Sequence, residues 1–106
     1  MNYYSIFYTN YVLKYQKISL SECLNLVSKV MKIPVKDLKS KSRSRKNADA
    51  RFIYFKLANH FNYNNTQITH LVNRDRANVY NALNQIDKIP ELQDYYKEVK
   101  RELIYE

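Results

Sequence analysis

The sequence of 106 residues contains no glycine, two prolines and a single cysteine. The absence of glycine excludes the glycine-rich loop with which many nucleotide-binding enzymes hold phosphate groups. As the only cysteine, Cys23 cannot form a disulfide within the chain. Cys23 and the two scattered histidines also lack the spacing of zinc ligands. We therefore expect no metal site and no cofactor.

Long apolar runs are also lacking. The sequence contains no stretch of eighteen consecutive apolar residues, which is about the length that a membrane-spanning helix needs. Residues 1–17 lack the uninterrupted apolar segment and the small-residue cleavage site of a signal peptide. We therefore expect a soluble, cytoplasmic protein that does not contact membranes.

Residues suited to catalysis are few. His60 and His70 are accompanied by no carboxylate or nucleophile pattern, so both are better suited to the surface or to packing than to acid–base work. No nucleophile, acid–base pair or phosphate loop can be assembled from the sequence. We expect neither an enzyme nor a small-molecule substrate.

The residues that are abundant are apolar and basic. Apolar residues make up 45% of the chain, with eleven tyrosines and four phenylalanines, which is enough for the core of one domain over residues 1–106. The net charge of +8 comes from residues 29–56, which contain ten basic and two acidic residues, whereas the rest of the chain is balanced. Charge concentrated in one segment favours a polyanionic partner, and a solvated basic face with no ligand is the equally open alternative.

Residues 18–33, ISLSECLNLVSKVMKI, have the pattern of an amphipathic helix. Ser19 and Glu22 form a capping-box pair. Apolar residues then follow the 3.6-residue period, namely Leu20, Cys23, Leu24, Val27, Val30 and Met31. Because Cys23 lies on this apolar face, we expect a buried structural thiol instead of a reactive one. The helix should end before Pro34, and VKDL should be a short helical turn or a connector.

A basic segment and a long helix come next. KSKSRSRK, residues 39–46, contains no apolar residue and therefore predicts an exposed loop. NADARFIYFKLANHF, residues 47–61, has core positions at the spacing of one helical face, namely Ala50, Ile53, Tyr54, Leu57, Ala58 and Phe61. This is the clearest helix in the sequence.

Two further helices with a tight corner are predicted after residue 65. TQITHLV, residues 66–72, can be capped by Thr66 and bury Ile68, Leu71 and Val72. Asn73 follows, and asparagine tolerates the left-handed backbone of a sharp turn better than other non-glycine residues. Asp75 can then cap a helix over 75–86. A helix, a sharp turn and a second helix make a helix-turn-helix unit.

In such units the start of the second helix meets base edges in the major groove of DNA. Arginine can donate two hydrogen bonds to the acceptor pair of guanine, and asparagine can form a bonded pair with adenine. Alanine can make an apolar contact with the methyl group of thymine. The candidate readers are Arg74, Arg76, Ala77, Asn78 and Asn81. The alternative is that these are ordinary exposed residues of a helical hairpin.

The segment from VSKVMKIPVKDLKSKSRSRKNADAR to ITHLVNRDRANVYNALNQI resembles the C-terminal DNA-binding domain of the bacterial replication initiator DnaA, from about Leu20 to Ile86. The resemblance implies an all-α, Trp-repressor-like helix-turn-helix fold of five to six helices. It also implies a basic loop over 41–46 in the minor groove, with Arg43 entering it beside Lys41 and Arg45. Lys39 and Lys46 flank these residues.

The resemblance further implies that Asp75, Arg76 and Ala77 read the adjoining major groove and that Arg51 lies near phosphates. The sequence departs from the family at several of these positions. Thr69 and Asn73 replace glycines of the family signature, and residues 76–78 replace its His-Thr-Thr. We therefore predict a different base preference. The chain is also too short for the ATPase module of the initiator.

Two segments flank the helix-turn-helix region of 18–87. Residues 88–106 predict a last helix, with Leu92, Tyr95, Tyr96, Val99 and Leu103 on its apolar face. Residues 1–17 place Tyr4, Tyr8, Tyr11 and Tyr15 on one helical face. This stripe could pack on the core of the chain, form a homodimer or bind a protein partner.

The sequence thus predicts a single domain that binds double-stranded DNA, with the basic loop supplying affinity and residues 74–78 supplying base choice. A bacterial nucleoid-associated or mobile-element-encoded protein that acts in replication or transcription would have these properties. The main alternative is an adaptor that docks a replication or mobile-element partner through the tyrosine stripe. RNA binding is a third hypothesis.

Overall fold

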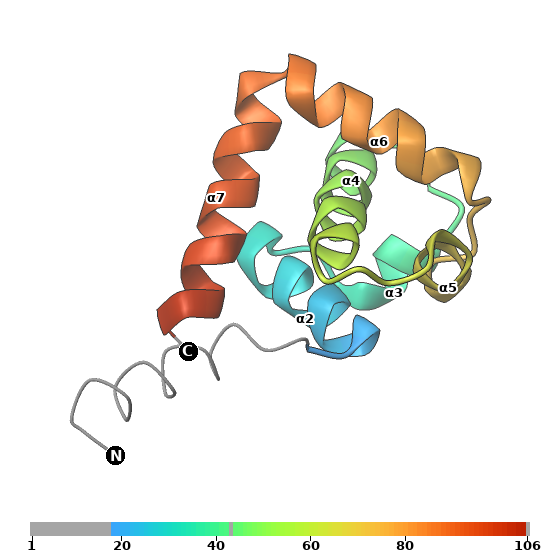
Figure 1. Ribbon diagram of the computed structural model, residues 1–106, viewed down its shortest axis with the longest axis horizontal. Helices are drawn as coiled ribbons and strands as arrows, with labels where there is room; N and C mark the ends of the chain where they lie inside the picture. The colour runs from blue at the N-terminus through green and yellow to red at the C-terminus, as the bar shows by residue number, and fades with distance from the viewer. Residues whose placement is uncertain (1–17, 43, 106) are drawn as a thin grey trace.

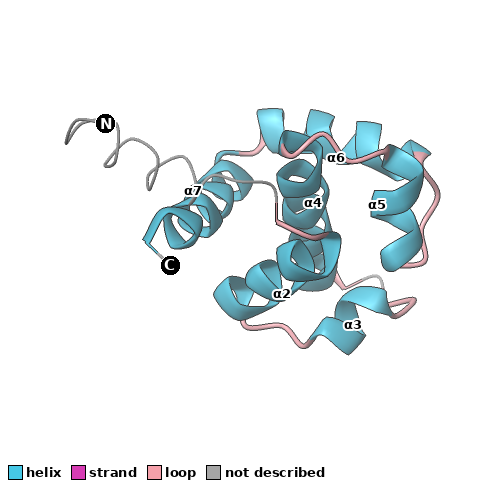
Figure 2. Cartoon of the chain, turned by 60° about the horizontal axis from the view of Figure 1, so that its bottom comes forward, coloured by secondary structure: helices cyan, strands magenta, loops and turns pink. Residues whose placement is uncertain are grey.

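A computed structural model describes residues 18–42 and 44–105 of the chain. The elements are α2 (Leu20–Met31), α3 (Val35–Lys39), α4 (Arg45–His60), α5 (Asn65–Leu71), α6 (Ala77–Lys88) and α7 (Pro90–Tyr105). Within these residues every regular element is a helix (Figure 2), which confirms the predicted all-α fold. The tyrosine stripe of residues 1–17 and Arg43 lie outside the described residues.

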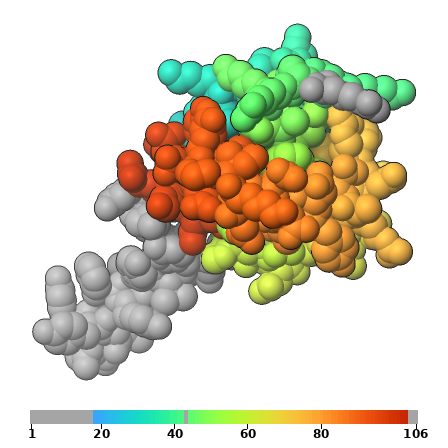
Figure 3. Space-filling view, turned by 90° about the horizontal axis from the view of Figure 1, so that it is seen from above, coloured from blue at the N-terminus to red at the C-terminus, as the bar shows by residue number. Residues whose placement is uncertain are grey.

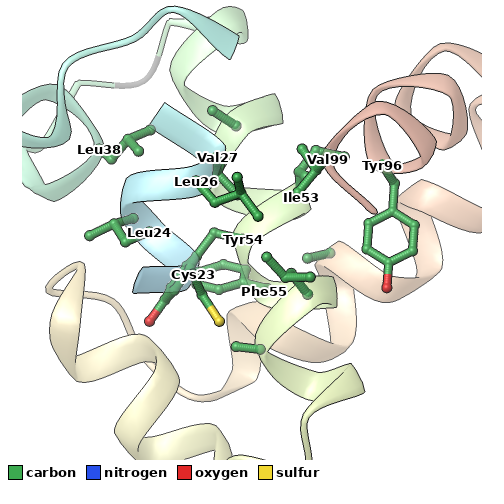
Figure 4. Packing of buried hydrophobic residues seen from close by; sticks show 14 of the residues in the cluster. Cys23, Leu24, Leu26, Val27, Leu38, Ile53, Tyr54, Phe55, Tyr96 and Val99 are labelled. Atoms are coloured by element: carbon green, nitrogen blue, oxygen red, sulfur yellow. The ribbon is translucent and has the colours of Figure 1, made fainter. Parts of the chain in front are cut away.

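The long helix α4 lies at the centre of the fold and contacts each of the other five helices (Figure 1). Its six predicted core residues, from Ala50 to Phe61, are all buried. Phe55 is buried as well, so α4 is covered on more than one side (Figure 4). The Tyr54 hydroxyl donates a hydrogen bond of 2.8 Å to the Ile68 carbonyl, which ties α4 to α5.

Helix α2 begins and packs as its sequence pattern predicts. The Ser19 hydroxyl oxygen accepts a hydrogen bond from the Glu22 backbone N–H and caps the helix. Four of the six residues of the predicted stripe are buried, while Leu20 and Val30 are half-buried. Cys23 is fully buried, and this burial raises the pKa of its thiol to about 12, with a smaller contribution from Glu22. The prediction that Cys23 is buried is confirmed.

Helix α7 packs on α2, α4 and α6 as the predicted last helix. Leu92, Tyr96, Val99 and Leu103 are buried and Tyr95 is half-buried, as the apolar pattern requires. Lys56 and Lys100 lie 5.3 and 5.7 Å from the centre of the Tyr96 ring. These cation–π contacts cover the edge of the core between α4 and α7. No helix in the described ranges is long and apolar enough to cross a membrane.

Among the residues that the structure describes, three take the left-handed backbone that glycine usually supplies. Lys32, Asn62 and Asn73 have φ values of 58°, 64° and 57°. Lys32 ends α2, and its N–H bonds the Ser28 carbonyl. Asn73 lies in the turn between α5 and α6, so the prediction for this residue is confirmed. The two asparagines adopt this backbone at little cost, whereas a lysine does so less readily.

Three predicted helix starts are wrong. Asn64 caps α5 instead of Thr66, because its side chain accepts a hydrogen bond from the Thr66 N–H. α6 begins at Ala77 with Arg76 at the cap position and no side-chain cap bond, so Asp75 is not its cap. α4 begins at Arg45, because Ser44 accepts a hydrogen bond from the Asn47 N–H. The predicted loop over 41–46 is therefore shorter, and Arg45 and Lys46 belong to the first turn of α4.

We predict that Lys32→Gly raises the free energy of unfolding by up to about 1 kcal/mol, because glycine adopts a positive φ without the clash of a Cβ atom. Asn25→Gly is the control. Asn25 is exposed in the middle of α2, where the same residue type should lower the stability by roughly 0.3 kcal/mol. Urea denaturation measures both. A Lys32→Gly protein less stable than the wild type would contradict the assignment of backbone strain to Lys32.

Candidate nucleic-acid interface

The loop that follows α3 lies beside the start of α6, with a cleft between them. The cleft has a volume of about 490 Å³. Its walls come from the loop, from α4, and from the turn and first half of α6, and the lining residues are Lys41, Ala48, Arg51, Phe52, Phe55, Arg74, Asn78 and Asn81. Figure 3 shows the outer atoms of α6 and α7, in orange to red, across one side of the molecule, with green atoms of the α4 region next to them. The fold thus brings the two sequence segments that were predicted to bind DNA to one face.

Arg51 reaches from α4 under the loop and bonds its backbone. Its Nε donates to the Leu38 carbonyl at 2.8 Å, and its Nη1 donates to the Ser42 carbonyl at 2.8 Å. Its Nη2 donates to the carbonyls of Asp37 and Ser40, both at 3.0 Å. Four of the five N–H groups of a guanidinium are therefore engaged within the protein, and the residue is only 4% exposed.

These bonds engage the Arg51 guanidinium with the protein itself, while Arg51 also lines the cleft. The side chain is buried and holds the loop from within, so its role in the fold is to position the basic segment. Burial lowers the pKa of Arg51 from its ordinary value, and the positive charge of Arg74 lowers it further. An arginine stays protonated at neutral pH even so.

Arg74 and Asn73 attach the helix-turn-helix corner to the same loop. The Nη2 of Arg74 donates to the Ser40 carbonyl at 2.8 Å, and its Nη1 also contacts the carbonyls of Val72 and Asn73. The Asn73 side-chain amide donates to the Lys39 carbonyl at 3.1 Å. We call the Ser40 carbonyl with its two arginine donors, Arg51 and Arg74, the Ser40 junction. Through it, the predicted base reader Arg74 is engaged with the protein backbone and is only half-exposed.

Alternate residues of the basic segment have different roles. Ser40 donates its hydroxyl to the Asp37 carbonyl and accepts a bond from the Ser42 N–H, and Ser42 in turn accepts one from the Ser44 N–H. The basic residues between and beside the serines are exposed at Lys39, Lys41, Arg45 and Lys46. The serines therefore shape the loop, while the cations point their charge to solvent. The alternation of serine with lysine or arginine in KSKSRSRK was the sequence signal for this arrangement.

The exposed charges of this face are nearly all positive. Arg45 forms an ion pair of 3.9 Å with Asp49, one turn further along α4. Burial raises the pKa of the Asp49 carboxyl, and Arg45 opposes that shift. Asp75 is exposed at the corner, and its backbone carbonyl accepts a bond from the Asn78 side chain at 3.0 Å.

Within the described ranges, no group of three His, Cys, Asp or Glu residues is arranged to hold a metal ion.

The remaining predicted readers lie at the start of α6. Arg76, Ala77 and Asn81 are exposed, and Asn78 is half-exposed on the side of the cleft. The outward face of α6 also carries Tyr80 and Asn84, both exposed, which the sequence pattern did not single out. The helical period of α6 identifies them, because its buried residues are Val79, Ala82 and Ile86 and positions 80 and 84 point elsewhere.

Comparison with known proteins agrees with this geometry. The sequence model of one protein family, described as bacterial dnaA protein helix-turn-helix, matches residues 20–86. This range runs from the first residue of α2 to near the end of α6. It therefore includes the basic segment, the Ser40 junction and the helix-turn-helix corner. No curated protein and no solved structure gives a significant match.

We predict that Arg51→Ala lowers the free energy of unfolding by about 3 kcal/mol, because it removes four hydrogen bonds to backbone carbonyls, one of them buried. Arg51→Lys should restore only part of the loss, since an ammonium cannot span four carbonyls as a guanidinium does. Arg45→Ala removes an exposed arginine of the same helix and should cost less than about 0.5 kcal/mol. Urea denaturation of the three variants checks this, and equal stability of Arg51→Ala and Arg45→Ala would refute the structural role.

Proposed function

This chain belongs to the family of bacterial DnaA helix-turn-helix domains, and from that premise we propose that it binds double-stranded DNA in a sequence-specific manner. The basic segment would lie in the minor groove or on phosphates, and the start of α6 would lie in the adjoining major groove. Binding of this kind requires no cofactor. The observation that supports the proposal best is the Ser40 junction, which attaches the loop of the basic segment to the corner that precedes α6.

The geometry of the cleft supports engagement of two grooves. Adjoining grooves of a duplex are separated by one sugar–phosphate backbone, so a protein that enters both must accommodate that strand between its two contact elements. The cleft lies between the loop and α6, and Lys41, Arg51 and Arg74 contribute positive charge to its lining. The positive potential of these groups would attract the strand. One strand of the duplex would thus follow the cleft.

The contact residues divide into two sets. The set that would supply affinity without base choice is cationic and consists of Lys39, Lys41, Arg43, Arg45 and Lys46, with Arg43 assigned from the family resemblance alone. The set that would read bases consists of Asp75, Arg76, Ala77, Asn78 and Asn81. Arg51 and Arg74 would act through the loop and corner that they hold. Arg76 is the base reader to test first, because it is exposed and arginine suits the acceptor pair of guanine.

Selection of binding sites from a random duplex library, at about 150 mM salt to screen charge-only binding, tests the proposal. We expect a defined motif from the wild-type chain. Arg76→Ala should lower affinity for that motif by roughly tenfold and blur one base position, because one bidentate pair contributes about 1 to 3 kcal/mol of discrimination. The matched control is Arg101→Ala, which removes an exposed arginine of α7 and should leave the motif unchanged.

Two outcomes would contradict the proposal. Recovery of no motif by the wild-type chain would exclude sequence-specific binding. An Arg76→Ala protein that selects the same motif with the same affinity would exclude Arg76 as a base reader. Competition with duplex and single-stranded RNA in the same assay separates DNA binding from RNA binding.

The salt dependence of binding gives a second prediction. From an estimated six or so phosphate contacts, the logarithm of the binding constant should fall against the logarithm of salt concentration with a slope of about −5. Lys41→Ala should weaken binding to all duplex sequences alike and make the slope shallower by about 1. Fluorescence anisotropy at several salt concentrations measures the slope. An unchanged slope for Lys41→Ala would show that Lys41 is no phosphate contact.

A further inference from the structure

Tyr80 is the most exposed large apolar side chain in the described part of the chain. It is 64% exposed on α6. Other described tyrosines differ from it: Tyr54 and Tyr96 are buried, and the half-buried Tyr63 and Tyr95 donate their hydroxyls to the Ile18 carbonyl and to Glu91. The domain thus buries or engages those rings and leaves Tyr80 on the surface of the helix that is proposed to enter the major groove.

The position of Tyr80 around α6 places it on the flank away from the loop. Ala77, Asn81 and Asn84 lie along the outward line of the helix, opposite the buried Val79, Ala82 and Ile86. Successive residues of an α-helix are rotated by about 100° around its axis. Tyr80, three residues after Ala77, therefore projects about 60° to one side of it. Asn78 and Asn81, which line the cleft, project to the other side. Tyr80 therefore points away from the strand that would follow the cleft.

The dimensions of the major groove decide what such a flank residue meets. An α-helix with its side chains is about 10 to 12 Å wide, and the groove is about 12 Å wide. The helix nearly fills the groove, so short outward residues reach the base edges and a long flank residue meets the wall. The wall on the side away from the cleft is the sugar–phosphate backbone of the second strand.

We propose that Tyr80 is a DNA-backbone contact, with its hydroxyl donating a hydrogen bond to a phosphate oxygen of the second strand and its ring lying against the neighbouring deoxyribose. This inference rests on the proposed duplex binding. Together with the loop, which holds the first strand, Tyr80 fixes the rotation of α6 in the groove. Base choice then stays with Arg76, at the cap position of α6, and with the shorter residues on the outward line.

The surroundings of Tyr80 favour a nucleic acid over a protein partner. A protein-docking surface is usually a contiguous apolar patch of several hundred Å². Tyr80 is instead followed by the exposed polar Asn81 and, one turn on, by Asn84. After the exposed Arg76 at its cap position, α6 carries no cation until Lys88, its last residue. A neutral donor with an apolar ring suits a phosphate and its sugar on this flank.

Tyr80→Phe tests the proposal most sharply, because it removes only the hydroxyl of an exposed residue. We expect Tyr80→Phe to weaken binding about tenfold on the selected duplex and on a scrambled duplex alike, since a lost hydrogen bond to a charged group acts in both. Tyr80→Ala should weaken both at least as much. Tyr95→Phe is the matched control, because it removes a tyrosine hydroxyl on α7 that bonds Glu91, and its affinity should equal that of the wild type.

A scan of single neutral methylphosphonates along the second strand locates the contact. At one phosphate position, the methylphosphonate should weaken binding by the wild type. The same methylphosphonate should not weaken binding by Tyr80→Phe any further, because that variant already lacks the hydroxyl. Wild-type affinity of Tyr80→Phe would overturn the proposal, and so would a Tyr80→Ala protein that weakens only the selected duplex, which would indicate a base contact. Absence of duplex binding by the wild type would overturn the proposed function itself.

Discussion

The Ser40 carbonyl oxygen accepts hydrogen bonds from two arginines that belong to different elements of the fold. Arg51 comes from the central helix α4, and Arg74 comes from the corner between α5 and α6. Two guanidinium groups on one carbonyl repel each other, and the lowered pKa of Arg51 reflects both its burial and the charge of Arg74. The carbonyls of Leu38, Asp37 and Ser42 offset that repulsion by accepting the other bonds of Arg51. The loop and the corner are thereby held to one another.

The consequence for binding is preorganisation. A loop of alternating serines and cations would lose much conformational entropy if it became ordered only on contact with DNA. Here the serine hydroxyls and Arg51 hold the backbone of residues 37–42 beforehand. The exposed cation Lys41 then lines the cleft beside α6. The free energy of phosphate contacts would therefore go into affinity and not into ordering the loop.

The pattern of apolar residues predicted most of this fold. Each predicted core residue of α4 is buried, because the 3.6-residue period is fixed by packing against other helices. Helix starts were predicted less well. Thr66 and Asn64 are both good caps, and only the tertiary path of the chain decides between them. The start of α6 could not be predicted from Asp75, because Arg76 takes the cap position without any side-chain bond.

The candidate site was predicted in outline but not in its internal roles. Charge and the resemblance to the family located the loop and the corner. The sequence does not distinguish an arginine that faces solvent from one that bonds the backbone, so Arg51 and Arg74 were grouped with the DNA contacts. Their roles depend on carbonyls 9 to 34 residues away in the sequence. Tyr80 was not among the predicted contacts, because the chain contains eleven tyrosines and a tyrosine indicates packing unless its exposure is known.

Dimethyl sulfate footprinting of one bound duplex tests most directly whether the loop and α6 act as a single two-groove unit. The reagent methylates guanine N7 in the major groove and adenine N3 in the minor groove, so one experiment reports both. A single two-groove unit should protect guanines in one major-groove segment and adenines in the minor groove next to it. Protection confined to one groove, or in grooves that do not adjoin, would contradict it.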